Sequence, residues 1–211
     1  MTRALTLCVI VATNAWALPP EKAKKAVAAA RELVGKTYEL GGRLRGAEGI
    51  DCQGVVFYAL ERIASCGWKS FSVNPTESVR FHELGEGVPG LFPVPTGELD
   101  PSLIQPGDVI MLLAPVENPA EPSMVTLGGE RLWVWHVGLA IGDGKWINAD
   151  PFTAQVTEGD LLPYLREHEY PSIAVTRMAK GPKPHRCRQN APMGTAAKRA
   201  APTVIGSGPK P

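Results

Sequence analysis

The sequence predicts an α+β domain in which N-terminal helices pack against a mainly antiparallel β-sheet. Apolar residues recur at helical spacing in the first third of the chain, and short apolar runs with the character of strands follow in the second half. Turn residues separate these runs. The length of 211 residues and the apolar content of 44% suit one domain of ordinary size with extensions.

Two helices are expected. The first covers residues 21–34, follows Pro20 and ends at Gly35. The second begins at Asp51 or Cys52 and runs to about residue 65, with Asp51 as a suitable N-cap. Each has an apolar face, formed in the first by Val27, Ala30, Leu33 and Val34, and in the second by Val55, Val56, Ala59, Leu60 and Ile63.

Four strands are expected in the second half of the chain, at residues 109–114, 132–141, 145–149 and 173–178. Residues 71–105 are rich in Pro and Gly and predict a mainly irregular connection, and residues 115–130 predict a surface loop. No internal repeat is present.

The first 17 residues have the pattern of a signal peptide. Arg3 precedes an apolar run at residues 4–12, and Ala15-Trp16-Ala17 provides small side chains at a cleavage site. The alternative is an N-terminal core helix, which Pro19-Pro20 would end. No stretch reaches the roughly 18 apolar residues of a membrane span. We therefore expect a protein exported to the periplasm or the medium, with its folded domain at residues 18–179 and no transmembrane segment.

Charge is unevenly distributed along the chain. The net charge is +1, yet residues 18–179 hold 14 basic and all 21 acidic residues, or about −7. Residues 180–211 hold seven basic residues and no acid, and their Pro, Gly and Ala content predicts a disordered basic tail. A nucleic-acid-binding domain would carry positive charge on its folded part, so we expect no nucleic-acid partner.

Removal of residues 1–17 would leave three cysteines. An odd number in an oxidising compartment suggests one disulfide and one free thiol. A bridge between Cys66 and Cys187 would leave Cys52 free, although three unpaired thiols are the alternative.

Cys52 is a candidate nucleophile. At a helix start its thiol would face unpaired backbone N–H groups and the positive end of the helix dipole, which lower the pKa of a thiol. The alternative is a small, buried apolar residue.

His136 is a candidate base. In the strand 132–141, Val137, Leu139 and Ile141 alternate with His136 and with small residues on its own side. The strand pattern therefore predicts an accessible imidazole, with a structural histidine as the alternative.

Asn148 is a candidate orienting residue. A three-residue turn at residues 142–144 would pair Gly138 with Asn148 and place Asn148 on the same face as His136. A two-residue turn would place it on the other face. A thiol, an imidazole and a carboxamide in contact form a nucleophile, a base and an orienting residue. Asp150 is the second candidate for the orienting role, since the same register places it opposite His136.

These residues belong to motifs that resemble the NlpC-type cell-wall cysteine peptidases. The motifs follow each other in the order of that family: residues 35–42 (GKTYELGG), 51–54 (DCQG), 106–108 (PGD), 136–138 (HVG) and 147–149 (INA). The resemblance covers about residues 21–178. It implies a papain-like α+β fold of NlpC type and hydrolysis of amide bonds in peptidoglycan stem peptides, typically after D-glutamate.

The resemblance also implies roles for individual residues. Cys52, His136 and Asn148 match the catalytic positions. Tyr38 matches a tyrosine beside the cysteine, and Asp51 matches a residue that holds the amino end of the peptide. In Gln53 the chain departs from the family, which usually has a small serine there, and this puts any preference for a free N-terminal L-alanine in doubt.

Further expectations complete this interpretation. Residues 85–101 and 115–130 look like insertions relative to the family. No CxxC or HxxxH spacing accompanies Cys52 or His136, so we expect no metal and no other cofactor. Trp133, Trp135 and Trp146 form either a platform for glycan or peptide or ordinary core and rim packing. We expect a monomer. The competing functions are a cysteine amidase or acyltransferase of the same fold and an inactive envelope-binding module.

Overall fold

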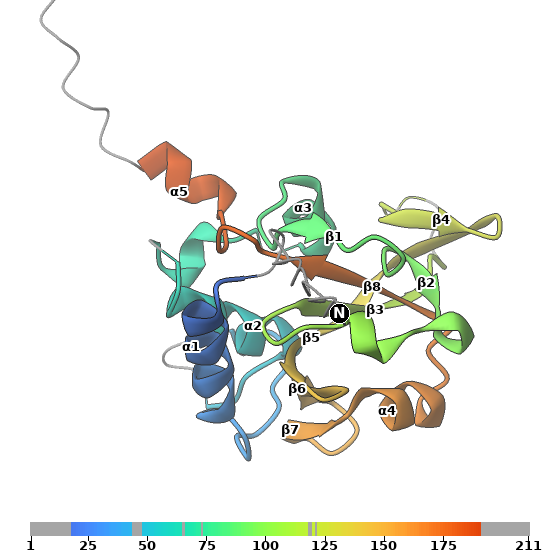
Figure 1. Ribbon diagram of the computed structural model, residues 1–211, viewed down its shortest axis with the longest axis horizontal. Coiled ribbons are helices and arrows are strands. Elements are labelled where there is room, and N and C mark those ends of the chain that lie inside the picture. The colour runs from blue at the N-terminus through green and yellow to red at the C-terminus, as the bar shows by residue number, and fades with distance from the viewer. Residues whose placement is uncertain are drawn as a thin grey trace, which may run out of the picture.

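The computed structural model describes residues 18–43, 48–64, 66–72, 74–117, 120 and 122–190 (Figure 1). The predicted signal peptide and residues 191–211 of the predicted tail lie outside the described residues. The helices are α1 (Pro20–Arg31), α2 (Cys52–Glu61), α3 (Pro75–Arg80), α4 (Leu161–Glu167) and α5 (His185–Asn190), with short 3-10 helices at Trp68–Ser70, Thr96–Glu98 and Pro101–Leu103.

The strands form one antiparallel sheet. Within the described residues it has eight strands: β1 (Glu86–Gly87), β2 (Val94–Pro95), β3 (Val109–Pro115), β4 (Val125–Leu127), β5 (Glu130–Gly142), β6 (Lys145–Asp150), β7 (Gln155–Asp160) and β8 (Ser172–Arg177). Their order is β1-β8-β3-β5-β6-β7, with β2 paired to β8 and β4 paired to β5. Helices packed on an antiparallel sheet confirm the predicted α+β class.

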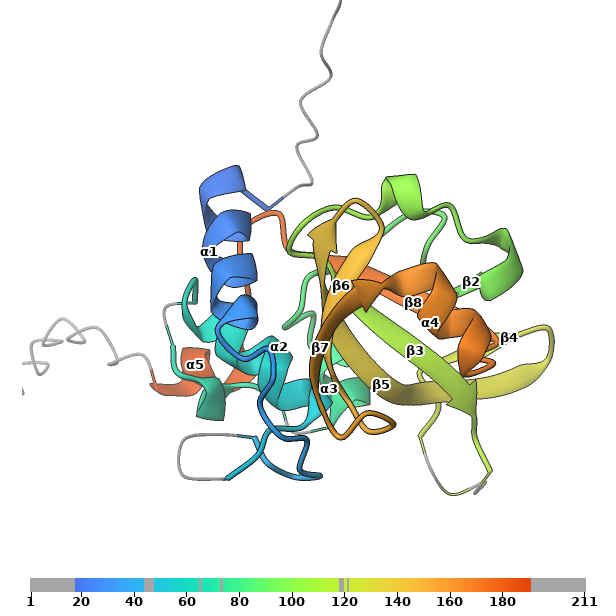
Figure 2. The ribbon, with the colours of Figure 1, turned by 90° about the horizontal axis from the view of Figure 1, so that it is seen from below.

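Both faces of the sheet are covered (Figure 2). On one face, called here the helix-pair face, α1 and α2 pack against Val109, Met111, Leu113, Val137, Leu139 and Ile147. On the opposite face, called the α4 face, α4 and parts of residues 88–104 pack against Ile110, Leu112, Ala140, Trp146, Ile173 and Val175. Because both of its faces are buried, β3 is apolar at successive positions rather than at alternate ones.

The N-terminal helix is shorter than the sequence predicts. α1 ends at Arg31 rather than at residue 34, and the chain turns through Gly35, whose φ of 84° is easily adopted only by glycine. Pro20 occupies the first turn of the helix, where its missing N–H costs nothing.

The turn between β5 and β6 differs from the predicted one, although the register beyond it agrees. The pairs Leu139–Ile147 and Ala140–Trp146 are those of the predicted register. However, Gly142 pairs with Lys145, so the loop has two residues and Ile141 is extra. Asp143 and Gly144 both have positive φ, as a type I′ hairpin turn requires. Ile141 therefore forms a bulge. Because of this extra residue, Asn148 lies on the same face of the sheet as His136, as predicted, although the turn has only two residues.

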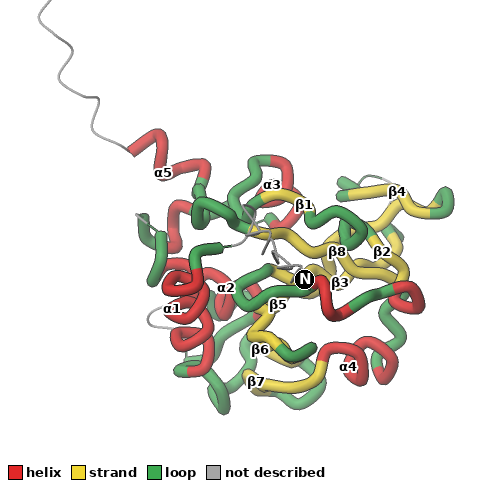
Figure 3. Tube along the Cα trace, in the orientation of Figure 1, coloured by secondary structure: helices red, strands yellow, loops and turns green. Residues whose placement is uncertain are grey.

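The sequence analysis missed β4, β7 and α4. β7 is an edge strand in which only Val156 is buried, so it lacks a clear alternation of apolar residues. α4 contains Pro163 in its first turn, where the helix tolerates it. Most of the stretch between α2 and β3 is loop, as expected, with α3 and short helical turns inside it (Figure 3).

The first part of the predicted disordered tail is folded. Residues 180–190, called here the C-terminal strap, end in α5 and pack on the body of the domain. Cys187 forms a disulfide with Cys66, with the Cα atoms 5.9 Å apart. The N–H of His185 donates to a carboxylate oxygen of the fully buried Glu83 at 2.8 Å. The composition of these residues predicted disorder. It could not reveal the two contacts above, which join residues more than 100 positions apart.

Candidate active site

Cys52 is the first residue of α2, and the local sequence explains this position. The Asp51 side chain caps the helix by accepting a hydrogen bond from the Gly54 N–H at 2.7 Å. Gly54 lies so close to Ile50 that an added Cβ would collide with it. A small residue at position 54 therefore lets the start of α2 pack closely against Ile50 and Gly42.

The Cys52 thiol is free, half-buried and held by two backbone donors. The N–H groups of Gln53 and Val137 both donate to it and favour its ionised form. Burial and the negative charge of Asp51 act more strongly in the other direction and raise the pKa of Cys52 to about 11. The lowered thiol pKa expected from the helix start is therefore wrong, since loss of solvent outweighs the backbone donors.

The thiol reaches Val137 because β5 and β6 separate at this point. Their pairing within the described strands ends at Leu139 and Ile147, and Asn148 and the next two residues pair only with β7. The N–H of Val137 is consequently not used by β6 and is available to Cys52.

His136 and Asn148 are in direct contact beside this opening. The His136 Nε2 atom lies 2.9 Å from the Asn148 carboxamide oxygen, so Nε2 carries the proton that is donated to it. Thr157 accepts from the carboxamide nitrogen at 3.4 Å and fixes its orientation. With Nε2 engaged, Nδ1 is the imidazole nitrogen that can act as a base.

The imidazole is more enclosed than the sequence predicts. Only 3% of His136 is exposed, because the ring of Trp146 fills the space beside Gly138 and meets the His136 ring edge to face at 5.8 Å. Burial lowers the pKa of His136, although the hydrogen bond with Asn148 and the charge of Asp150 oppose this shift. The imidazole is therefore uncharged at neutral pH.

Asp150, the second candidate for the orienting role, makes other contacts. Its carboxylate accepts hydrogen bonds from the Phe152 N–H at 2.9 Å, the Thr153 hydroxyl at 2.8 Å and the Tyr164 hydroxyl at 3.2 Å. It stabilises the turn between β6 and β7 and influences His136 only through its charge.

The predicted substrate-binding residues surround the helix start. Asp51 is 2% exposed and, besides capping α2, accepts from the Gly41 N–H at 3.2 Å and from Arg43 at 2.8 Å. Tyr38 is half-buried, and burial followed by the charges of Cys52 and Asp51 raises its pKa. Gln53 is 5% exposed. The Asp51 carboxylate is thus already paired with a cation, Arg43.

Three rings near the site escaped the sequence analysis. The Tyr164 ring is stacked on His136 with centroids 6.4 Å apart, and it stacks in turn on Tyr170 at 6.4 Å. His168 meets the edge of Tyr164 at 4.4 Å. Burial raises the pKa of both tyrosines, for Tyr170 to about 12. Tyr164 and His168 are four positions apart, a spacing at which side chains on a helix meet, and this was the signal in the sequence.

The residues that the structure describes contain neither a candidate metal site nor a candidate membrane span. The part of the chain that the structure describes contains no group of three or more His, Cys, Asp or Glu side chains arranged to hold a metal ion. In the same residues no helix combines the length and the apolar character needed to cross a membrane.

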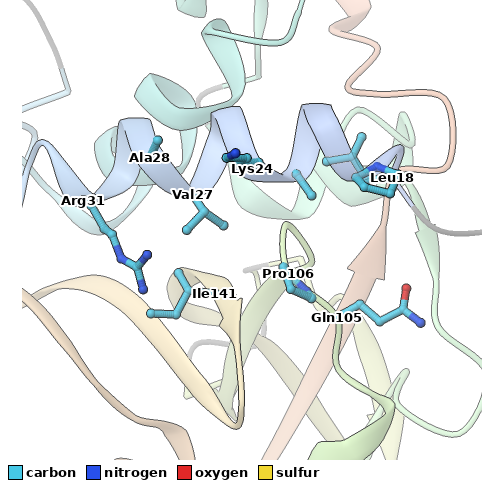
Figure 4. Close-up of a pocket in the computed structure, with 10 residues that line it drawn as sticks. Leu18, Lys24, Val27, Ala28, Arg31, Gln105, Pro106 and Ile141 are labelled. Atoms are coloured by element: carbon cyan, nitrogen blue, oxygen red, sulfur yellow. The ribbon is translucent and has the colours of Figure 1, made fainter.

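An apolar pocket lies elsewhere, between α1 and the turns at Pro106 and Ile141 (Figure 4). None of the candidate catalytic residues lines it. Its walls are formed by Leu18, Pro20, Ala23, Lys24, Val27, Ala28, Arg31, Gln105, Pro106 and Ile141.

Solved structures resemble this fold. An N-acetylmuramoyl-L-alanine amidase from Bacteroides uniformis aligns at a TM-score of 0.51 and 14% identity, over 75% of this chain and 99% of that one. NlpC1 from Trichomonas vaginalis aligns at 0.46 and 22%, over 74% and 43%. An NlpC/P60 family protein from Bacillus cereus aligns at 0.48 and 18%, over 77% and 41%. No protein-family model and no curated protein matches the chain.

The molecule is an α+β protein with a free thiol at the start of a helix. Its α+β fold is shared with the Bacteroides uniformis amidase, the structure above whose TM-score exceeds 0.5. The chain spans less than half of the Trichomonas and Bacillus proteins.

Proposed function

We propose that this protein is a cysteine peptidase that hydrolyses amide bonds in the stem peptides of peptidoglycan. Cys52 is the nucleophile, His136 the base and Asn148 the residue that orients the base. The Bacteroides uniformis structure of the same fold is named an N-acetylmuramoyl-L-alanine amidase, which supports an amide of the cell wall as the substrate.

The observation that carries this proposal is the arrangement at the opening between β5 and β6. The Cys52 thiol accepts from the N–H of Val137, and the neighbouring residue His136 is bonded through Nε2 to Asn148. These contacts hold the nucleophile beside the segment that carries the base. They also leave Nδ1 of His136 available for the thiol proton.

The mechanism follows from the protonation states. Burial favours the neutral thiol and the neutral imidazole, so the resting pair is uncharged. The Cys52 sulfur attacks the scissile carbonyl carbon while His136 takes the thiol proton. His136 then protonates the leaving amine as the C–N bond breaks and an acyl-enzyme forms. Water, deprotonated by His136, releases the acid, and the backbone N–H of Cys52 stabilises the oxyanion.

Within this class, we assign the cut to the bond between D-glutamate and the diamino acid, which is the bond that the family resemblance implies. Asp51 bears on this assignment because Arg43 and the start of α2 already occupy its oxygens. Recognition of a free peptide amine through Asp51 would require displacement of Arg43.

Digestion of purified peptidoglycan, followed by mass analysis of the fragments, tests the proposal. The wild type should produce new termini after D-glutamate. Cys52→Ala should release no fragments while keeping its thermal unfolding midpoint, since it removes only the nucleophile. As a matched control, a Cys66→Ser/Cys187→Ser double variant keeps Cys52 and should retain turnover at temperatures where it is folded.

Other outcomes distinguish the competing functions. Near-normal cleavage by Cys52→Ala rejects Cys52 as the nucleophile. Cleavage between the lactyl group and L-alanine identifies an amidase, and binding without fragments identifies an inactive module.

We also propose that the protein is exported, is cleaved after Ala17 and acts as a monomer. The disulfide between Cys66 and Cys187 suits an oxidising compartment. N-terminal sequencing of the secreted protein should begin at Leu18, and an N-terminus at Met1 would contradict cleavage.

A further inference from the structure

Exposed apolar side chains gather around the candidate active site. Among the described residues, six large apolar side chains are exposed, and three of them adjoin the site: Leu40, Trp135 and Phe152. Leu40 follows Tyr38 by two residues and precedes Gly41, which bonds to Asp51. Isolated apolar residues on a surface need no explanation, but exposed ones beside candidate site residues are candidates for contact with a substrate.

Trp135 differs from the other two because its indole N–H has a partner while more than half of its side chain stays exposed. Its side chain is 55% exposed, yet its indole N–H is hydrogen-bonded to the hydroxyl of the buried Tyr170. Trp133 meets the Trp135 ring edge to face, with centroids 5.5 Å apart. A ring whose polar group is already satisfied presents a rigid, purely apolar plane to solvent.

The backbone at Trp135 contributes to this exposure. In the pairing of β5 with β3, Leu112 faces His136 and Leu113 faces Val134, so Trp135 is the unpaired residue of a β-bulge. Bulges redirect side chains and are frequent beside active sites. Here the bulge presents Trp135 to solvent directly before His136, the proposed base, turns into the protein.

Stacked rings connect Trp135 with the proposed base. Tyr170, which accepts from the indole, stacks on Tyr164, and Tyr164 stacks on His136. A molecule lying on the Trp135 face is therefore held by the same ring assembly that supports the imidazole.

We infer that Trp135 stacks against a sugar ring of the glycan strand that carries the stem peptide. This inference rests on the proposed function. The peptide part of such a substrate consists of small alanines and charged residues, which gain little from a wide aromatic plane. A pyranose ring is rigid and has a face of C–H bonds that matches an indole in size and polarity, while its hydroxyl groups remain in water. The protein therefore prefers stem peptides that are still attached to sugar.

Two matched substrates test this inference: a stem peptide linked to the N-acetylglucosaminyl-N-acetylmuramyl disaccharide and the same peptide without sugar. The wild type should have the higher kcat/KM on the sugar-linked form. Trp135→Ala should lower kcat/KM on the sugar-linked form about tenfold more than on the free peptide, the size of one aromatic stacking contact. Trp135→Phe should retain part of the preference.

Phe81→Ala provides the control, because Phe81 is also an exposed aromatic residue but lies at the end of α3. It should change neither rate. Equal rates of the wild type on both substrates, or an equal loss on both in Trp135→Ala, would overturn the inference, and an equal loss would identify a wall for the peptide instead.

A binding measurement separates this inference from the proposed function. The free disaccharide is titrated into Cys52→Ala, and the indole N–H signals are followed by NMR. A saturable shift that is lost in Cys52→Ala/Trp135→Ala supports the sugar contact even if no peptide is cleaved. No shift at millimolar disaccharide rejects it, whatever the hydrolysis assay shows.

Discussion

The two faces of the sheet are covered by different kinds of side chain. The helix-pair face is packed mainly with aliphatic residues from α1, α2 and the strands, and Cys52 adjoins it. The α4 face carries rings, among them Trp146, Tyr164 and Tyr170, and His136 packs with two of these. Burial is common to both faces, but its effect on ionisation has the opposite sign for an acid and for a base.

Burial favours the neutral form of both the Cys52 thiol and the His136 imidazole. The pKa of Cys52 rises and that of His136 falls, so neither group is charged near neutral pH. A preformed ion pair is therefore disfavoured, and in the proposed mechanism proton transfer accompanies attack on the substrate. Three experiments break or sharpen this comparison, from the largest expected effect to the smallest.

The pH dependence of Cys52 alkylation has the largest expected effect. Since only the thiolate reacts, a pKa of about 11 means that the rate at pH 8 is about a thousandth of its limiting value and rises about tenfold per pH unit. Iodoacetamide labelling of the folded protein measures this rate. Asp51→Asn keeps an N-cap but removes the adjacent negative charge, so it should accelerate labelling at fixed pH. A rate that is already constant between pH 6 and pH 8 would reveal a preformed thiolate and contradict the neutral pair.

Removal of the carboxamide at Asn148 has the next largest effect. Without its partner on Nε2, the His136 ring can turn or change tautomer, and Asn148→Ala should lower kcat/KM about a hundredfold, within the usual contribution of a positioned base. Steady-state hydrolysis of a sugar-linked stem peptide measures this loss. Asn148→His, which restores a ring nitrogen as partner, should recover part of the activity. Activity of Asn148→Ala within twofold of the wild type would exclude the orienting role.

The tight packing of the α4 face predicts the smallest effect. A Cβ at position 138 would collide with the ring of Trp146 and the carbonyl oxygen of Ile147, so Gly138→Ala should lower the free energy of unfolding by about 1–3 kcal/mol. Urea titration measures this change. Gly159→Ala on β7 is the matched control, because nothing lies within 4 Å of its Cβ. Equal stability of the two variants would contradict the close contact between Trp146 and Gly138.

The sequence predicted the parts of the fold that depend on local patterns. The helix start at Cys52 follows from Asp51 as N-cap, and the β5–β6 register follows from alternation and glycines. β7 and α4 were missed because their signals are weak: β7 buries a single side chain, and α4 includes a proline. The strap escaped prediction because its contacts, such as that of His185 with Glu83, join distant residues.

For the site, residue types and spacing indicated Cys52, His136 and Asn148, but not their electrostatics. The direction of the Cys52 pKa depends on how much solvent the folded chain removes, and a single sequence does not contain this quantity. Likewise, the ring that covers His136 comes from the next strand, and the tyrosine stacked on it comes from a helix that the sequence did not reveal.

Trp135 is an extra residue in β5, so the alternation of side chains between the two faces of the sheet is interrupted there. Val134 and Val137 both face α2 although three positions separate them, which a regular strand does not permit. Removing Trp135 would restore the regular alternation and leave Val134, His136 and Val137 on the faces that they now occupy. The bulge therefore adds an exposed aromatic side chain to β5 without changing the face on which His136 lies.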